Sequence, residues 1–296
     1  MVDPILSTLK ISNPNKIMWP ETGTTKLEFI TYLYQVSDYI LPYLMNRCLT
    51  VIRFPDGVEG ESFYQKNIPA HAPSWIQTTL WKNTEYIVCN TKETLLWLAN
   101  LASLELHITF NRIEKENYPT ELVFDLDPSV PGFPRVREAA LVLRDALGAL
   151  SLTSYAKTSG ATGMQVYVPL VWKYTYQDIR KVSHFLSTFL VEKRPDLFTV
   201  ERLKKNRGEK LYIDYVQQAP GKTLPAPYSL RARLLPSVST PVTWEEVEKG
   251  FVPEDFTIDK IPKRLEDKGD LFAPLHHGGK ESLDEVLEFI DSQWLN

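Results

Sequence analysis

Hydrophobic positions along the chain follow two spacings. Apolar residues recur at helical spacing over residues 25–44, 91–101, 134–147 and 175–191, which predicts amphipathic helices. Apolar runs suited to extended chain predict strands over 48–54, 104–110, 121–126, 152–156, 164–170 and 211–216. We expect Pro128 to stop the strand before it and Gly148 to end the helix before it. Since strands and helices interleave without strict βαβ regularity, the pattern indicates an α+β, or mixed α/β, fold with mixed sheets.

Two short motifs late in the chain predict helix starts. Thr243 and Ser282 are each followed three residues later by Glu246 and Glu285, the spacing of a capping box. There is no internal repeat, and the 21 prolines are scattered rather than gathered in a linker. We therefore treat residues 1–296 as a single domain.

The net charge of the chain does not indicate a polyanionic partner. Lys plus Arg is 33 and Asp plus Glu is 37, so the formal net charge is −4. Nucleic-acid binding would need basic residues gathered locally. One such run holds five cations, and taken alone it fits a solvated surface as well as a nucleic-acid contact: Arg202, Lys204, Lys205, Arg207 and Lys210.

Cysteine usage and the N-terminal sequence indicate a cytoplasmic protein. Cys48 and Cys89 are far apart and lack zinc-site spacing, so a disulfide framework and a structural zinc site are not supported. The N-terminal residues lack a signal-peptide pattern, and no apolar run approaches the roughly 18 residues of a membrane span. We expect no export and no membrane partner.

Three aspartates form the strongest chemical signal. Asp125 and Asp127 lie two apart on an apolar strand, so their carboxylates project from one face and repel. A divalent cation between them would make the pair tolerable, although an exposed strand end also explains two Asp residues. Asp214 lies within another apolar run, where either a metal or an ion pair would be needed. Three acids on two strands are able to hold the two metals of phosphoryl or nucleotidyl transfer.

Several weaker signals suggest phosphate handling. The segment KTSGATGMQ places Lys157, Ser159, Thr162 and Gln165 around a glycine-containing turn whose hydroxyls and amides could contact phosphate, although most such turns are only turns. His107 alone would be read as an ordinary sheet histidine. Two cations in later loops could reach a triphosphate: Lys222 and Arg231.

Seven ordered stretches together resemble one family, the polymerase domain of bacterial DNA ligase D, a member of the archaeo-eukaryotic primase superfamily that works in non-homologous end joining. These stretches are NPNKIMWP, VIRFPDGVEGESFYQKN, LASLELHITFNR, LVFDLDPS, KTSGATGMQVYVPL, ERLKKNRGEKLYIDYVQ and GKTLPAPYSLRAR. The resemblance implies a primase-like catalytic core of mixed and antiparallel sheets flanked by helices. It also divides the chain into a DNA-end-binding side (about 1–100), a catalytic core (about 101–240) and a C-terminal helical extension (about 241–296).

The resemblance also implies roles for residues. Asp125, Asp127 and Asp214 correspond to ligands of Mn²⁺ or Mg²⁺, and His107 lies near the incoming nucleotide. Further nucleotide contacts are expected at Lys157, Ser159, Thr162, Gln165, Lys222 and Arg231. DNA contacts are expected at Lys16 and Lys26, which grip a downstream 5′-phosphate, at Phe63, which stacks on a template base, and at Lys66, Lys204, Lys205 and Arg207.

The implied activity is two-metal nucleotidyl transfer to a 3′-hydroxyl, with gap filling and end extension on DNA, NTPs preferred over dNTPs, and Ku and a DNA ligase as partners near the nucleoid. This sequence departs from many relatives at Gln165, where they carry His, and at Thr162, where they carry Lys. Gln donates a hydrogen bond but carries no charge, so nucleotide affinity should differ.

Two alternatives remain open from the residues alone. The segment DLDPS also fits a haloacid dehalogenase-type phosphohydrolase, in which Asp125 would be the nucleophile. A catalytically idle DNA-end-binding module is the other alternative, and it predicts that Asp125 is dispensable.

Overall fold

The chain divides into two compact units, each built from separate segments of sequence. A computed structural model describes residues 10–294. The first unit takes the chain up to Thr109, then Thr223–Ser239 and Glu254–Gly269. The second takes Phe110–Lys222, Thr240–Pro253 and the segment from Asp270 onward. We describe each unit by itself, and the single-domain assignment stays a prediction.

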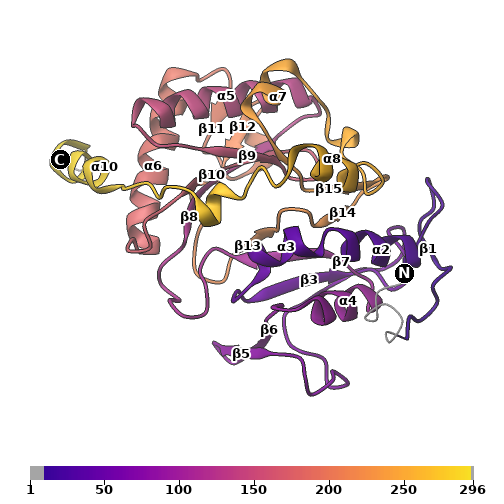
Figure 1. Cartoon of the computed structure of the whole chain (residues 1–296). Helices are drawn as coiled ribbons and strands as arrows, with labels where there is room; N and C mark the ends of the chain where they lie inside the picture. The colour runs from indigo at the N-terminus through magenta and orange to yellow at the C-terminus, as the bar shows by residue number, and fades with distance from the viewer. Residues whose placement is uncertain (1–9, 295–296) are drawn as a thin grey trace. The chain divides into compact units, whose positions relative to one another are not determined.

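The first unit is built on an antiparallel sheet. Its strands follow the order β13-β7-β3-β6-β5, with β4 also paired to β3 (Figure 1). The bounds are β3 (Leu49–Arg53), β4 (Phe63–Gln65), β5 (Thr78–Trp81), β6 (Thr84–Ile87), β7 (Ser103–Thr109) and β13 (Thr223–Pro225). The smaller elements are β1 (Ile17–Trp19), β2 (Thr24–Thr25), β14 (Leu230–Ala232), β15 (Pro236–Val238), α2 (Lys26–Gln35), α3 (Ser37–Leu44), α4 (Lys92–Asn100) and α8 (Ile261–Lys268).

The helix expected over residues 25–44 is two helices rather than one. Thr25 caps α2 in a full capping box with Glu28, and the helix ends at Val36. There the Ser37 hydroxyl donates to the Tyr34 carbonyl oxygen at 2.8 Å. A side chain that takes a backbone acceptor in this way competes with the helical hydrogen bond, which hydrophobic periodicity does not register.

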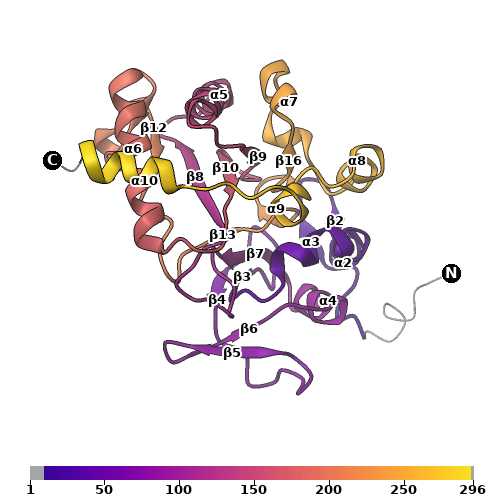
Figure 2. The same cartoon turned by 60° about the vertical axis from the view of Figure 1, so that its left-hand side comes forward.

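The second unit is built on a mixed sheet. Its strands follow the order β11-β12-β8-β10-β9-β16, with only β11 and β12 parallel. The bounds are β8 (Glu121–Pro128), β9 (Tyr155–Thr158), β10 (Met164–Pro169), β11 (Phe198–Thr199), β12 (Leu211–Ile213) and β16 (Pro241–Val242). The helices are α5 (Phe133–Ala149), α6 (Tyr176–Lys193), α7 (Trp244–Lys249), α9 (Pro274–His277) and α10 (Asp284–Phe289), with short turns η1 (Lys204–Asn206) and η3 (Ile290–Trp294). Both long helices, α5 and α6, pack against β8 (Figure 2).

Some expected boundaries in this unit are wrong. Gly148 lies inside α5, because its backbone conformation is helical and the chain turns only after Leu150. Pro128 belongs to β8, at its last position, where a strand tolerates a missing amide donor. Asp214 follows β12 instead of lying within it. The strand expected over residues 152–156 is β9, three residues later at its start.

The two expected capping boxes differ in outcome. Thr243 does cap α7, with Glu246 returning the hydrogen bond. Ser282 does not cap α10, whose N-cap position is Leu283. The Ser282 hydroxyl instead bonds the Tyr174 hydroxyl at 2.8 Å and accepts from the Asp284 amide at 3.2 Å. A tertiary contact has replaced the local cap.

Candidate active site

Asp125 and Asp127 lie on one face of β8, as the spacing predicts. Along the strand Leu126 is fully buried, Asp125 is partly buried and Asp127 is exposed. The apolar side chains on the other face fix the strand in the core, so the acid-bearing face is set by packing. The expected pair of carboxylates on one face is therefore present.

Neighbouring strands extend this acid face into a row across the sheet. In the antiparallel register Gln165 of β10 lies opposite Asp125, and Lys157 of β9 lies opposite Gln165. On the other side Ile213 of β12 lies opposite Leu126. The next residue along the chain is Asp214, so the antiparallel register places it beside Asp125. Directly opposed residues share a face, which brings residues separated by up to 89 positions together.

Hydrogen bonds orient the acids at both ends of this row. Gln165 Nε2 donates to Asp125 Oδ1 at 3.0 Å, and Gln165 is almost fully buried. Asp214 Oδ1 accepts from the Tyr212 hydroxyl at 3.0 Å and from the Val216 amide at 3.1 Å. Each acid is therefore held by a neighbour that the sequence did not suggest as its partner.

The electrostatics of Asp125 are those of a crowded buried acid. Burial, and then the charge of Asp127, raise the pKa of Asp125 to about 7, against the opposing effects of the Gln165 hydrogen bond and the Lys157 charge. Asp214 contributes a further increase. A carboxylate pair with a raised pKa is the environment that a bound cation relieves, so the donor chemistry fits a hard divalent ion.

The three acids do not form a ready-made metal cluster. Among residues 10–294, no group of three or more His, Cys, Asp or Glu side chains could hold a metal ion. Asp214 Oδ1 is engaged by Tyr212 and Val216, and like charges disfavour closer approach. The Asp125–Asp127 pair is the part of the predicted ligand set that the fold assembles on one strand.

The loop between β9 and β10 lies against the acidic strand. A Cβ atom at Gly163 would sit 2.5 Å from the Leu126 carbonyl oxygen and 3.3 Å from Asp127 Oδ1. Only glycine permits that approach. The Ser159 hydroxyl accepts from the amides of Ala161 and Gly163 at 3.2 and 3.1 Å, and Thr162 is exposed on the same loop.

The basic run near β12 is partly tied to the acid face. Lys204 and Lys205 are exposed on η1, as a nucleic-acid contact requires. Arg207 instead stacks its guanidinium over the Tyr212 ring at 3.9 Å, and its Nε donates to the Glu201 carbonyl oxygen. Tyr212 in turn donates to Asp214, so Arg207 supports an acid more directly than its place in a charge run suggests. Lys222, at the end of this unit's main segment, is exposed.

His107 and Arg231 belong to the first unit, where a shared carboxylate brings them together. On β7, His107 Nε2 lies 2.8 Å from Glu105 Oε2. Arg231 Nε, on β14, lies 2.9 Å from the same oxygen. Burial alone would raise the pKa of Glu105, but the His107 hydrogen bond, Arg231 and the Ala232 amide outweigh it and lower the pKa to about 2.

A second cationic group of the first unit gathers around Lys26. Its ammonium is buried and donates to the Ser12 carbonyl and hydroxyl oxygens at 2.7 and 2.8 Å. Burial, and then the nearby charges of Lys16 and Arg53, lower the pKa of Lys26 to about 8. Lys16 is held by Asp56 at 2.8 Å. Such a concentration of positive charge suits a multiply charged anion.

Phe63 lies at the edge of the same group. Its ring is 45% exposed, and the Arg53 guanidinium lies 5.2 Å from the ring centroid. An exposed aromatic ring suits stacking on a base. Lys66 is also exposed, one residue beyond β4.

Sequence reasoning missed three residues that organise these groups: Glu105, Arg53 and Tyr212. Glu105 could have been found from its spacing, because residues two apart on a strand share a face and Glu105 precedes His107 by two. Tyr212 likewise precedes Asp214 by two. Arg53 carries no such signal, because the ring of Phe63 and the charge of Lys26 come from other segments and become its neighbours only through folding.

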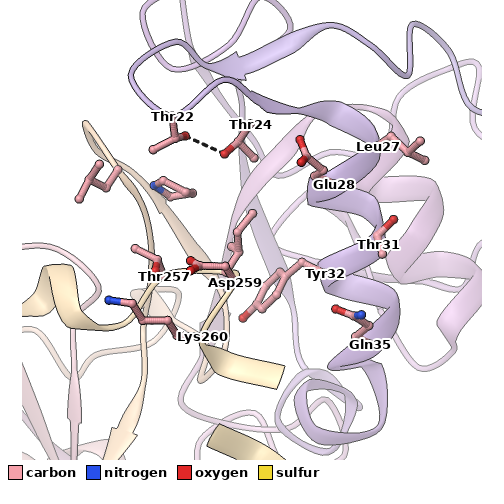
Figure 3. Close-up of a pocket in the computed structure, with 13 residues that line it drawn as sticks. Thr22, Thr24, Leu27, Glu28, Thr31, Tyr32, Gln35, Thr257, Asp259 and Lys260 are labelled. Atoms are coloured by element: carbon pink, nitrogen blue, oxygen red, sulfur yellow. Dashed lines mark hydrogen bonds between the residues drawn. The ribbon is translucent and has the colours of Figure 1, made fainter. Parts of the chain in front are cut away.

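A separate pocket lies beside α2. It has a volume of about 770 Å³. Figure 3 shows Glu28, Thr31 and Tyr32 along the helix on one side and Asp259 and Lys260 on the other. The predicted site residues do not line it.

Comparison with known proteins identifies relatives. The bifunctional non-homologous end joining protein LigD of Bacillus subtilis is 42% identical over 289 residues, which cover 97% of this chain and 47% of the relative. The multifunctional non-homologous end joining protein LigD of Mycolicibacterium smegmatis is 35% identical, over 90% of this chain and 36% of the relative. The chain thus spans about half the length, or less, of these relatives.

The fold has a close counterpart among solved structures. The polymerase domain of Mycobacterium tuberculosis ligase D, solved in complex with DNA, superposes with a TM-score of 0.85 at 30% identity, over 90% of this chain and 97% of that chain. This confirms the predicted primase-like fold of helices with mixed and antiparallel sheets. No helix in the described part of the chain is long and apolar enough to cross a membrane. Residues 25–272 match the family described as LigD, primase-polymerase domain. The chain therefore belongs to the LigD primase-polymerase family, whose fold is that of polymerase-type nucleotidyltransferases.

Proposed function

We propose that this chain extends a DNA 3′-hydroxyl with nucleotides at gaps and broken ends during non-homologous end joining. Family membership supports nucleotidyl transfer over the phosphohydrolase alternative. The observation that carries the proposal within this chain is the acidic row of the second unit, in which Asp125 has a pKa raised to about 7 beside Asp127. Polymerase chemistry requires divalent metal and a nucleotide, and this is where the chain concentrates negative charge.

Asp125 and Asp127 would hold the metals, and Asp214 would complete the ligand set beside the attacking hydroxyl. Bound divalent ions lower the pKa of an attacking hydroxyl and stabilise the charge on a leaving pyrophosphate. Gln165 would keep Asp125 oriented through its 3.0 Å hydrogen bond. Gly163 would let the loop backbone lie close to Asp127, with Ser159 and Thr162 on the same loop available for phosphate oxygens. Mn²⁺ and NTPs are the metal and nucleotides that we propose as preferred.

The first unit would supply the cations. His107 and Arg231 of this unit would face nucleotide phosphates. In the second unit, Lys222 is exposed and would be a further phosphate contact, whereas Lys157 is fully buried opposite Gln165. The cluster of Lys16, Lys26 and Arg53 would take the 5′-phosphate of the downstream strand. The lowered pKa of Lys26 supports this role, because an anion relieves the repulsion among three cations.

Template and partner contacts complete the proposal. Phe63 would stack on a template base, and Lys66, Lys204, Lys205 and Arg207 would contact the DNA backbone. The relatives are named as end-joining proteins, so we propose that Ku and a DNA ligase activity are partners of this chain. The Mycobacterium tuberculosis counterpart was solved with DNA, which supports DNA as the substrate here.

A gapped duplex tests the activity. The native chain, Asp125→Asn and the surface control Asp38→Asn would be given a gapped substrate, with or without a downstream 5′-phosphate, plus Mn²⁺ or Mg²⁺ and NTPs or dNTPs. Asp38 is a suitable control because its side chain is 76% exposed and pairs with Lys92 at the surface. We expect extension by the native chain and Asp38→Asn alone. If Asp125→Asn extends equally well, the idle end-binding alternative is favoured. Extension that ignores the 5′-phosphate would remove the role of Lys16 and Lys26.

A further inference from the structure

Glu105 lies at the centre of a buried charge cluster in the first unit. Its side chain is only 6% exposed. One oxygen, Oε2, meets His107 Nε2 at 2.8 Å and Arg231 Nε at 2.9 Å. The other oxygen, Oε1, accepts from the Ala232 amide at 2.9 Å. Two hydrogen-bonding groups and one guanidinium, from two strands, thus converge on one carboxylate.

The backbone fixes this arrangement. Glu105 and His107 lie two apart on β7, so both project from the same face. The segment carrying Arg231 is joined to β7 by a second bond, since the Leu106 amide donates to the Ser229 hydroxyl at 2.8 Å. Arg231 therefore reaches Glu105 from a strand that is itself held against β7.

A surface ion pair would not have this geometry. An exposed carboxylate gains little from one cation, because water and salt screen the attraction. Here the acid is buried, and removing any one partner would leave charge or donors unsatisfied in the interior. Burying a carboxylate costs desolvation free energy. A buried carboxylate is therefore expected where it holds its partners in a required orientation.

We propose that Glu105 is a positioning residue for the nucleotide-phosphate side of the site. It binds the Nε2 edge of the His107 imidazole and the Nε of the Arg231 guanidinium. These two contacts fix the orientation in which His107 and Arg231 would meet an anion such as the nucleotide triphosphate. This inference rests on the proposed function, because it assigns the ligand of His107 and Arg231 as a nucleotide phosphate.

The first test uses steady-state kinetics with a double-mutant cycle. Glu105→Gln keeps the shape of the side chain but removes its charge. We expect the KM for NTP to rise about tenfold, with a smaller change in kcat, because ground-state placement of phosphate-binding groups is lost. In a His107→Ala background the same change should have little further effect, since coupled residues are non-additive. Fully additive effects, or an unchanged KM, would overturn the proposal.

The second test reads the imidazole directly. Nitrogen-15 NMR of the histidine rings reports the tautomer, and the native chain should hold the proton of His107 on Nε2, facing Glu105. Glu105→Gln should shift the tautomer population or broaden the signal. An identical His107 signal in both proteins would show that Glu105 does not set the ring. This readout does not depend on catalysis, so a native chain that fails to extend primers refutes the proposed function without deciding the role of Glu105.

Two further variants separate positioning from structure. Glu121→Gln removes another buried acid, in the second unit and outside the candidate site, and should leave the NTP KM and the His107 signal unchanged. If Glu105→Gln does not fold, Glu105→Asp retains the charge but draws the carboxylate back by one methylene. Glu105→Asp should then raise the KM in the same direction, whereas a native KM in this variant would contradict positioning.

Discussion

Two strands carry acids in the same pattern and give them opposite properties. On β7, Glu105 lies two residues before His107, and on β8, Asp125 lies two residues before Asp127. The pKa of Glu105 is lowered to about 2, while that of Asp125 is raised to about 7. Both acids are largely removed from water. The difference is the charge of the neighbour on the same face and of the groups brought by other segments.

The comparison separates two uses of a buried acid. Glu105 meets donors and stays ionised, so it acts as a fixed support for cations. Asp125 meets further acids, so its charge is costly until a cation arrives. A buried acid among hydrogen-bond donors stabilises the fold. A buried acid among other acids destabilises the fold, and a bound cation relieves that repulsion.

The largest expected effect on activity comes from substituting Asp125, the acid whose neighbours carry the same charge. Asp125→Asn should reduce primer extension by roughly a thousandfold or more, above the 10–100-fold typical of residues that only support a metal ligand. A single-turnover assay of primer extension would measure both variants, and Glu105→Gln should lose less activity than Asp125→Asn. A larger loss of activity in Glu105→Gln would contradict these roles.

The stability of Glu105→Gln should fall, and the loss should depend on pH. The folded pKa of about 2 lies below the ordinary value of 4.5, so the carboxylate stabilises the fold above about pH 4.5 and loses this contribution as pH falls toward 2. Urea denaturation at pH 7 should show a loss on the order of 3 kcal/mol. At pH 3 the native chain and the variant should differ by much less. An equal loss at both pH values would point to packing instead of charge.

Asp125→Asn should change stability in the opposite direction. Its folded pKa of about 7 lies above the ordinary 3.8, so the native carboxylate destabilises the fold increasingly as pH rises from about 4 to 7 and fully above 7. In EDTA at pH 8 the variant should be more stable by on the order of 4 kcal/mol. The gain should vanish below about pH 4, and a destabilised variant at pH 8 would contradict the raised pKa.

A substitution at Gly163 tests the close approach of the β9–β10 loop to the acidic strand. Gly163→Ala should cost about 1–3 kcal/mol, because its Cβ would press on the Leu126 carbonyl oxygen, and it should also slow extension by disturbing Asp127. Gly148→Ala is the matched control, since nothing lies within 4 Å of its Cβ and it sits inside α5. This control should be neutral or stabilising in thermal denaturation. Similar losses in both variants would mean that the loop tolerates no special approach.

The smallest expected effect concerns Lys26, a buried cation with other cations nearby. Lys26 has a pKa lowered to about 8, so it is mostly charged at pH 7 and mostly neutral at pH 9. The affinity for a gap with a 5′-phosphate should fall by up to about tenfold between these pH values. Affinity for the unphosphorylated gap is the control and should change less. Parallel changes for both substrates would show that Lys26 does not contact the phosphate.

Much of the fold could be predicted because each element carries its own periodicity. The strand that holds Asp125 and Asp127, the helices α4, α5 and α6, and the cap at Thr243 follow from local patterns. The predictions that are wrong involve side-chain hydrogen bonds that hydrophobic periodicity does not register. Ser37 bonds the nearby Tyr34 carbonyl oxygen where the helix breaks, and Ser282 gives up its cap for the distant Tyr174. Asp214 falls just beyond its strand and bonds Tyr212 and Val216.

The site divides in the same way. The sequence by itself determined which acids, cations and glycines are available, and the spacing of two on a strand determined that Asp125 and Asp127 share a face. Folding alone brings Gln165 to Asp125 and Arg231 to Glu105, whereas Tyr212 lies two residues from the Asp214 that it bonds. The physical reason is range: side-chain direction along a strand is set by adjacent residues, whereas the pKa of a buried group depends on whichever charges folding brings within a few ångströms.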